Sequence, residues 1–132
     1  MKQAYLGIKF YADQSNRPLI EMITAALTQA GWTTQVIVRD LEQWGVAQFE
    51  PQMLMARTFA VIEVSDIAVI DLTEKGVGLG IEAGYAFAKG IPVFTIAREG
   101  ADISATLRGI SQNIYHYKNE DDLVLYMQTL MV

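Results

Sequence analysis

The chain has 132 residues, a net charge of −5, 52% apolar residues, no cysteine and a single histidine, His116. This length and composition fit one domain, residues 1–132, with a real core, and they exclude disulfides, thiolate metal sites and a histidine-rich metal cluster. The acidic balance argues against nucleic acid as the main partner, no apolar run is long enough to span a bilayer, and the first residues do not form a signal peptide, so we expect a cytoplasmic protein.

Strand-like and helix-like segments alternate along the chain. Residues 66–72 form an almost continuous apolar run, which is typical of a strand buried on both faces. Apolar residues recur at helical spacing over residues 19–30, where Pro18 fits the first turn and Gly31 fits the end. The pattern predicts strands at residues 4–10, 33–38, 66–72, 91–97 and 113–117, and helices at residues 19–30, 52–64, 81–88 and 120–131. Residues 39–51 and 98–109 are interpreted as loops, each with room for a short helical turn.

This alternation predicts an α/β fold: a single doubly wound domain with a five-stranded parallel sheet and helices on both faces, of the flavodoxin-like or Rossmann-like kind. In such sheets, ligands bind beyond the carboxyl ends of the strands, near the point where the strand order reverses. We therefore expect three loops to line the functional site, at residues 10–17, 73–80 and 98–109.

The segment KGVGLGIEAGYA, residues 75–86, carries three alternating glycines between a buried strand and a helix: Gly76, Gly78 and Gly80. Alternating glycines let backbone N–H groups approach a ligand, and the start of the following helix attracts negative charge. The same spacing also allows tight packing of a strand against a helix, so both interpretations stay open. The spacing does not match the GxGxxG dinucleotide fingerprint, and no Gly-Lys-Ser/Thr follows, as a P-loop would require.

Glu82 is the one acidic residue in this segment. A carboxylate in the first turn of a helix is favoured by the helix dipole, and it is often only a helix-start residue. The neighbours Ile81, Ala83 and Gly84 suit a buried turn, so we expect a carboxylate that is partly desolvated yet held ionised by the helix end. That state fits a nucleophile or a group that stabilises positive charge.

Residues 77–93, VGLGIEAGYAFAKGIPV, resemble the signature of the nucleoside 2-deoxyribosyltransferase family, which includes the related 2′-deoxynucleoside 5′-monophosphate N-glycosidases. Residues 5–16, YLGIKFYADQSN, are similar to the family's first strand, and residues 107–113, LRGISQN, are similar to its late loop. The resemblance covers most of the chain and is weak over residues 32–62.

The resemblance implies a retaining displacement, in which Glu82 attacks C1′ of a 2′-deoxynucleoside and expels the base. A second base, or water, then attacks the covalent deoxyribosyl intermediate. The implied partners are a small-molecule deoxynucleoside or deoxynucleotide and a free base, and no metal or organic cofactor is required. By the same resemblance Tyr5 orients the Glu82 carboxylate, although tyrosine is also a common packing residue in strands. Shared active sites imply a homo-oligomer in which Asn113 completes a neighbouring subunit's site; otherwise Asn113 is a turn residue.

Further substrate-binding candidates lie around the first predicted strand, at the end of the predicted strand 66–72 and in the glycine-rich segment. Phe10 and Tyr11 either stack on a nucleobase or cover the edge of the core. Asp71, at the end of the predicted strand 66–72, either supplies a further carboxylate or is a strand-end turn residue. The glycine candidates are Gly7, Gly76 and Gly78.

Two positions depart from the family's pattern: Thr58 and Gly76 stand where a carboxylate is usual. These departures leave open how the base is protonated and how the 5′-hydroxyl is recognised. Two alternatives therefore accompany deoxyribosyl transfer, namely hydrolysis of 2′-deoxynucleoside 5′-monophosphates and a catalytically inert nucleotide-binding module. Few residues resemble those that donate hydrogen bonds to a phosphate in the family; Arg108 and Ser111 are among them. Their scarcity favours a nucleoside over a nucleotide as substrate.

Overall fold

The computed structural model describes residues 2–130 and confirms the expected parallel α/β sheet. Its strands are β1 (Gln3–Gly7), β2 (Thr33–Gln35), β3 (Ile67–Asp71), β4 (Val93–Arg98) and β5 (Asn113–Tyr117), and its α-helices are α1 (Arg17–Gln29), α2 (Pro51–Glu63), α3 (Val77–Ala88), α4 (Ala105–Ile110) and α5 (Glu120–Met127). All strands are parallel and lie in the order β2-β1-β3-β4-β5. Because the chain leaves β1 toward one side for β2 and returns to the other side for β3, the strand order reverses between β1 and β3.

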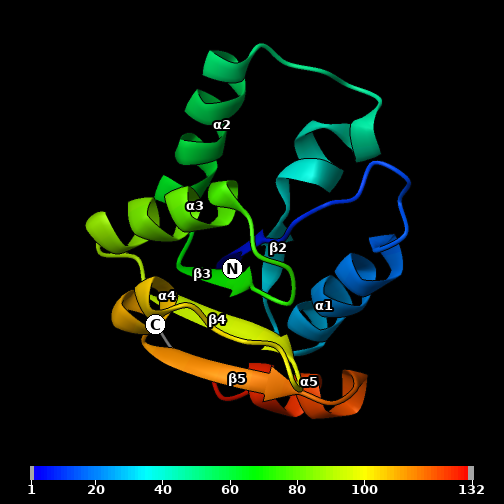
Figure 1. The fold of residues 1–132 in the computed structure, drawn as a ribbon, viewed down its shortest axis with the longest axis vertical. Helices are drawn as coiled ribbons and strands as arrows, with labels where there is room; N and C mark the ends of the chain where they lie inside the picture. Colours follow the sequence, from blue (N-terminus) through cyan, green and yellow to red (C-terminus); the bar gives the residue numbers. More distant parts are fainter. Residues whose placement is uncertain (1, 131–132) are drawn as a thin grey trace.

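Helices cover both faces of the sheet (Figure 1). α1 packs against α5 on one face, while α2, α3 and α4 follow one another on the other face. Each layer closes its own apolar core, so every residue of β3 is buried. The core under α1 and α5 is built from residues such as Leu6, Ile20, Ile23, Leu27, Leu123 and Met127. The core under α2, α3 and α4 is built from residues such as Ile62, Ile70, Leu79, Ala83 and Leu107.

Local signals set several helix ends as the sequence predicts. Pro18 stands in the first turn of α1, where its missing N–H costs no hydrogen bond. Gly31 follows α1 with a φ of 97°, the left-handed conformation that a glycine adopts without a steric penalty. The side chain of Asn119 accepts a hydrogen bond of 2.9 Å from the backbone N–H of Asp122 and so caps α5.

The start of α3 differs from the sequence prediction, which placed it at residue 81. The helix begins at Val77, so Gly78 and Gly80 lie inside its first turns rather than in a loop. Glycine weakens a helix, but Leu79 and Ala83 are buried against the sheet and hold these turns in helical form. As a consequence Glu82 stands in the second turn of α3, further from the helix start than expected.

Other boundaries also move. The predicted strand 4–10 ends at Gly7, and the predicted strand 33–38 ends at Gln35. A short helix, α4, occupies the end of the segment interpreted as the loop 98–109, where a short helical turn was expected, and extends one residue beyond it. Within residues 2–130, no helix combines the length and apolar character that a bilayer crossing requires.

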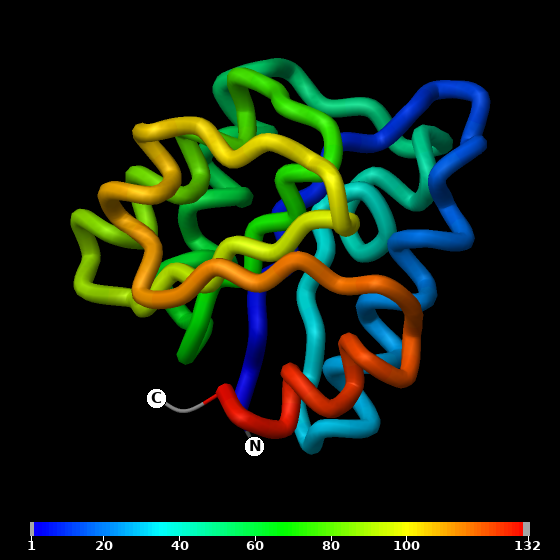
Figure 2. The backbone as a smooth tube through the Cα atoms, turned by 60° about the horizontal axis from the view of Figure 1, so that its bottom comes forward, coloured from blue at the N-terminus to red at the C-terminus, as the bar shows by residue number. Residues whose placement is uncertain are grey.

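The connection from β2 to α2 is the most irregular part of the backbone. A π-helical turn, η1 (Ile37–Leu41), is followed by a single 3₁₀ turn, η2 (Gln43–Gly45). In the latter, Gln43 and Trp44 adopt left-handed conformations with φ of 49° and 58°. Figures 1 and 2 both place the loop after β1 beside this connection, and the rings of Phe10 and Trp44 are in contact, 5.8 Å between centroids.

Candidate active site

Two cavities open at the carboxyl end of β1, where the strand order reverses. The first, about 260 Å³ in volume, contains Glu82 and is called here the Glu82 cavity. The second, about 290 Å³, contains Asp71 and is called the Asp71 cavity; Ile8 contributes to both. This is the edge of the sheet at which ligands bind in doubly wound folds, as the sequence analysis expected.

The Glu82 cavity is formed by four parts of the chain. β1 with its following loop, the connection after β2, helix α2 and helix α3 each supply one wall. Most of the lining is apolar, and the polar side chains are few, which is typical of a small-molecule site. Its lining residues include Tyr5, Leu6, Ile8, Phe10, Val36, Ile37, Val38, Leu54, Met55, Gly78 and, as polar side chains, Glu42, Thr58 and Glu82.

Glu82 and Tyr5 form the polar centre of this cavity. Tyr5 lies in β1, is 1% exposed, and donates a hydrogen bond of 2.5 Å from its hydroxyl to Oε1 of Glu82. Burial, with the nearby Glu82 carboxylate, raises the pKa of Tyr5 far above its ordinary value, so the hydroxyl remains the donor. The hydrogen bond fixes the Glu82 carboxylate toward the cavity.

The protonation state of Glu82 differs from the expectation of a carboxylate held ionised by a helix end. Burial raises the pKa of Glu82 to about 7, the Tyr5 hydrogen bond lowers it, and the charge of Glu42 raises it further. The helix dipole acts mainly within the first turn of a helix, and Glu82 lies in the second turn of α3. Desolvation therefore dominates, and a large fraction of Glu82 is protonated at neutral pH.

Gly7, the last residue of β1, lies against the Glu82 carboxylate. A Cβ atom at this position would lie 2.8 Å from Cδ1 of Ile70 and 3.0 Å from Oε1 of Glu82. Carbon atoms in contact are normally separated by 3.5–4.0 Å. The absence of a side chain at Gly7 is thus what allows Glu82 to pack against the end of β1.

The other glycine and aromatic candidates divide between the two cavities. Phe10 and Gly78 line the Glu82 cavity, where a Cβ atom on Gly78 would lie at ordinary contact distance from Glu82. Tyr11 lines the Asp71 cavity instead. Gly76 precedes α3 as its N-cap, in an extended conformation, and lines neither cavity.

Asp71 does not line the Glu82 cavity. Successive side chains of a strand point to opposite faces, so Ile70 faces Gly7 and Glu82 while Asp71 faces the other core. Asp71 is 1% exposed and accepts hydrogen bonds of 2.7 Å from the Tyr117 hydroxyl and 2.9 Å from the backbone N–H of Thr73. Asp71 thus lines the Asp71 cavity rather than the Glu82 cavity, and its contribution to substrate binding stays a prediction.

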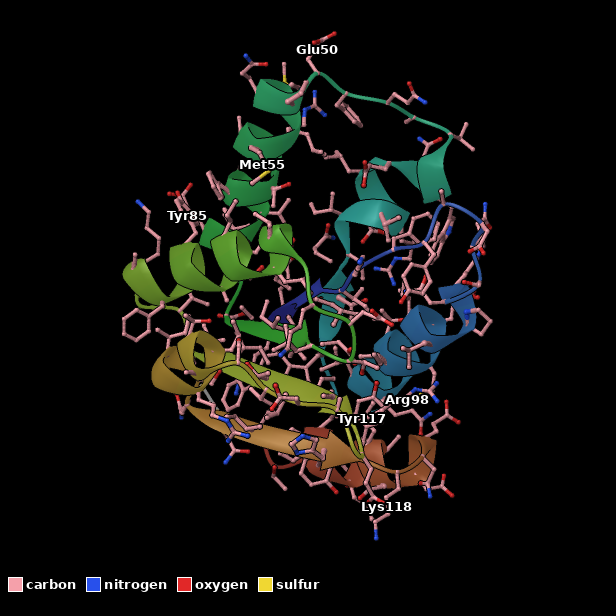
Figure 3. The ribbon with its side chains drawn as sticks, viewed as in Figure 1. Glu50, Met55, Tyr85, Arg98, Tyr117 and Lys118 are labelled. Atoms are coloured by element: carbon pink, nitrogen blue, oxygen red, sulfur yellow. The ribbon has the colours of Figure 1, made fainter. Side chains whose placement is uncertain are left out.

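Residues at the carboxyl ends of β4 and β5 influence the pKa of Asp71. Figure 3 shows Arg98 and Tyr117 at the carboxyl ends of these strands. Burial raises the pKa of Asp71, whereas the Tyr117 and Thr73 hydrogen bonds and the Arg98 charge lower it. This network anchors the loop that leads from β3 to α3, and it thereby supports the position of Glu82.

Asn113 lies far from both cavities in its own chain. It begins β5 and so lies at the amino-terminal edge of the parallel sheet, opposite the edge where both cavities open. Its side-chain oxygen accepts a hydrogen bond of 2.7 Å from the Tyr126 hydroxyl. A contribution of Asn113 to a neighbouring subunit stays a prediction.

Glu42 and the wall that surrounds it were not predicted from the sequence. These residues belong to the connection after β2, where the resemblance is weak, and the local pattern gave no motif. The signal is positional and needs the strand order: because β2 lies beside β1 in the sheet, the residues after β2 approach the carboxyl end of β1. Thr58, by contrast, was singled out, and it lines the Glu82 cavity with its hydroxyl donating to the backbone oxygen of Leu54 at 2.8 Å.

Residues 2–130 contain no group of three or more histidine, cysteine, aspartate or glutamate side chains placed to hold a metal ion. The ionisable side chains that line the Glu82 cavity are two carboxyl groups and one phenol, from Glu82, Glu42 and Tyr5.

No family model matches the chain. A candidate 2′-deoxynucleoside 5′-phosphate N-hydrolase of Thermofilum pendens is 24% identical to it over 139 residues, which cover 98% of this chain and 94% of that protein. Among solved structures, a CMP N-glycosidase of Clostridium botulinum matches with a TM-score of 0.69 and 19% identity, covering 98% of this chain and 100% of that chain.

A second solved structure, the 2-deoxyribosyltransferase of Bacillus psychrosaccharolyticus, matches with a TM-score of 0.74 and 14% identity, covering 98% of this chain and 92% of that chain. These two structures share the fold of this chain. Together with the sequence match to the Thermofilum pendens protein, they confirm that the chain resembles the nucleoside 2-deoxyribosyltransferase family over nearly its whole length.

Proposed function

We propose that this protein is a glycosyl-transferring enzyme in which Glu82 attacks C1′ of a 2′-deoxynucleoside and a second nucleobase completes the transfer. One observation carries the proposal: a carboxylate with a pKa of about 7 is aimed by a tyrosine hydroxyl into an apolar cavity at the reversal point of the sheet. Perturbed carboxylates in such cavities are strong candidates for catalytic groups.

The first half of the reaction uses the Glu82 carboxylate as nucleophile. One of its oxygens forms a bond to C1′ while the bond from C1′ to the base nitrogen breaks, and the electron pair of that bond leaves with the base. The transition state has the character of an oxocarbenium ion. A carboxylate with little solvation is well placed to stabilise that positive charge, because the surrounding walls exclude water.

The second half of the reaction reverses the first with a new partner. A ring nitrogen of a free base attacks C1′ from the vacated side, the ester bond to Glu82 breaks, and the carboxylate is regenerated. Two displacements at one carbon retain its configuration. Water in place of the base would give hydrolysis, so the apolar lining around Phe10 and Val38 favours transfer by excluding solvent.

Hydrolysis of a 2′-deoxynucleoside 5′-monophosphate is the second candidate, and a specific observation favours it. The Asp71 cavity adjoins the Glu82 cavity through Ile8 and carries the cationic residues Lys9 and Arg98, which could attract a phosphate. The relative from Thermofilum pendens carries the name of that activity. The same cavity also holds Asp71 and Glu74, whose negative charges oppose an anion.

One set of incubations separates the two activities. The purified protein is mixed with 2′-deoxyinosine and adenine, and separately with 2′-deoxyadenosine 5′-monophosphate, and the products are separated by chromatography. Formation of 2′-deoxyadenosine in the first mixture supports transfer. Release of adenine from the monophosphate, without exchange in the first mixture, supports hydrolysis. Saturable binding of these compounds without turnover of either would contradict both and would leave a nucleotide-binding module.

Substitution of Gly7 by alanine is expected to lower the rate about 100-fold or more, because the new methyl group displaces the Glu82 carboxylate from its reacting position. The crowding against Ile70 should also cost about 1–3 kcal/mol of unfolding free energy. Activity assays and urea denaturation measure the two effects.

Gly80→Ala is the matched control for this prediction. A Cβ atom at Gly80 meets no atom within 4 Å, and the residue lies inside α3. Alanine should there stabilise the helix by about 0.5–1 kcal/mol and leave the rate unchanged. Equal rates for the Gly7→Ala and Gly80→Ala variants would show that the close approach of Gly7 to Glu82 has no catalytic importance.

A further inference from the structure

A second carboxyl group, Glu42, lines the Glu82 cavity from another wall. It comes from the connection between β2 and α2, whereas Glu82 comes from α3. Burial raises the pKa of Glu42, and its charge in turn raises the pKa of both Glu82 and Tyr5. The three groups are therefore coupled across one cavity, which is the arrangement that acid–base chemistry at a shared substrate requires.

The Glu42 side chain has no partner among the described residues. Within residues 2–130, it makes neither a hydrogen bond nor an ion pair, although it is half-buried. The nearest acid in the chain, Asp40, is engaged: it accepts a hydrogen bond of 2.8 Å from the backbone N–H of Val36 and pairs with Arg39. A half-buried carboxyl group that faces a cavity without a protein partner is available to a ligand.

The backbone that carries Glu42 is strained. A π-helical turn ends at this residue, and its N–H donates to the backbone oxygen of Ile37 at 2.9 Å. The next two residues, Gln43 and Trp44, are both in the left-handed region, which is unfavourable for residues other than glycine. Such conformations persist only where the surrounding structure imposes them, and they concentrate at functional sites.

Contacts from two other elements impose this conformation. The Trp44 ring lies against the guanidinium group of Arg17, 4.1 Å from the ring centroid, and against the ring of Phe10. Its backbone oxygen also accepts a hydrogen bond of 3.4 Å from Gln14. The loop after β1 and the start of α1 thus hold the strained turn in place, and with it the position of Glu42.

From this placement we propose that Glu42 is the acid–base residue that handles the proton of the nucleobase; the inference rests on the proposed glycosyl transfer at Glu82. As C1′ bonds to Glu82 and the glycosidic bond breaks, the carboxylic acid of Glu42 gives its proton to a ring nitrogen of the departing base. Glu42 is then a carboxylate. In the second half it accepts the proton that the incoming base or water loses on bonding to C1′.

The remaining polar groups of the cavity are less suited to this role. The Tyr5 hydroxyl donates to Glu82, and its pKa lies too far above neutrality for proton transfer at useful rates. The Thr58 hydroxyl donates to a backbone oxygen. Among the described residues that line the cavity, Glu42 is the ionisable group left once Tyr5 and Glu82 have their roles.

Two substrates that differ in their need for a proton test the assignment. The base of 2′-deoxyadenosine must be protonated as it leaves, whereas the base of 7-methyl-2′-deoxyguanosine already carries a positive charge and leaves without a proton. Glu42→Gln should lower the rate on 2′-deoxyadenosine by about 10²–10⁴-fold. On the methylated substrate, the rate of the same variant should fall by less than about fivefold, once the spontaneous decay of the substrate has been subtracted.

The pH profile gives a second readout that a merely structural role would not move. With 2′-deoxyadenosine the wild-type rate should pass through a maximum, because one proton must be shared between Glu42 and Glu82. With the methylated substrate the alkaline decline should be absent, since only ionised Glu82 is then required. An alkaline decline of equal size for both substrates would contradict the role of Glu42.

Glu50→Gln is the matched control. Glu50 belongs to the same connection, is exposed, and points to solvent at the start of α2 (Figure 3). Its variant should keep wild-type rates on both substrates, and Glu42→Asp should recover part of the rate on 2′-deoxyadenosine. If Glu42→Gln keeps the wild-type rate on 2′-deoxyadenosine, or loses equally on both substrates, the assignment is wrong. If the wild-type protein turns over neither substrate, the proposed glycosyl transfer itself fails.

Discussion

Replacement of Glu82 by glutamine is expected to reduce turnover of a deoxynucleoside by about 10⁴-fold or more, because an amide cannot form the ester to C1′. Glutamine has the same shape as glutamate and can still accept the hydrogen bond from Tyr5 through its amide oxygen. The loss would therefore reflect the missing nucleophile rather than a collapsed cavity. Steady-state rates on the substrate identified by the exchange assay measure it.

Binding measurements separate this loss of chemistry from a loss of affinity. Because the cavity walls are unchanged, the variant should bind its deoxynucleoside within about tenfold of the wild-type affinity. A Glu82→Gln variant that turns over substrate at more than about a tenth of the wild-type rate would exclude Glu82 as the nucleophile.

The same substitution is expected to stabilise the fold at alkaline pH. The pKa of Glu82 is about 7 in the folded protein against an ordinary value of 4.5. A raised carboxyl pKa means that the folded state holds its proton more tightly than the unfolded state, so stability is present below pH 4.5 and is lost as pH rises through 7. At pH 8, ionised Glu82 should cost about 2–3 kcal/mol of unfolding free energy.

Urea denaturation at pH 5 and pH 8 tests this prediction. Glu82→Gln carries no charge to bury, so at pH 8 it should exceed the wild type by about 2–3 kcal/mol, and at pH 5 the two proteins should differ by well under half of that. Glu50→Gln, at an exposed position, should follow the wild type at both pH values. An unchanged difference between Glu82→Gln and the wild type at the two pH values would show that Glu82 is not a buried, destabilised carboxylate.

Burial of the Glu82 carboxylate has opposite effects on reactivity and on the stability of the fold. A nucleophile with little solvation reacts well but destabilises the fold that holds it, and active sites commonly show this trade-off. Here Tyr5 offsets part of the cost, because its hydrogen bond lowers the pKa of Glu82 against the effect of burial.

Much of the fold could be predicted from local patterns. The run at residues 66–72 is buried on both faces as β3 because its residues are apolar without interruption. The Pro18 and Gly31 signals place the ends of α1 near their observed positions. These features depend on the chemistry of a few adjacent residues, which a sequence displays directly.

Features that depend on distant contacts were harder to predict. The first turns of α3 are rich in glycine and indicate a loop when considered alone, but burial of Leu79 against the sheet makes them helical. The left-handed turn at Trp44 follows no local signal, because Arg17 and Phe10 impose it from other elements.

In the candidate site too, some residues could be predicted from local patterns, whereas others depend on distant contacts. Glu82 and Tyr5 could be singled out from a short motif and a resemblance, and the structure joins them by a hydrogen bond. Asp71 was singled out as a carboxylate at the end of a strand, but a strand-end position does not say which cavity it lines; the alternation of side chains along β3 directs it away from Glu82 and into the Asp71 cavity. Glu42 could not be found at all, since its approach to Glu82 results from the order of β2 and β1 in the sheet.

Mass spectrometry of a trapped intermediate tests the central claim most directly. A nucleoside with fluorine at C2′ of its sugar should slow both displacements, because fluorine destabilises the positive charge at C1′, and a good leaving group should let the ester accumulate. Trypsin cleavage after Lys75 and Lys89 isolates residues 76–89, in which Glu82 is the sole side-chain carboxylate. We expect the mass of the fluorinated sugar on this peptide. The sugar on residues 40–57, which contain Glu42, or product formation with no peptide ever labelled, would contradict a covalent role for Glu82.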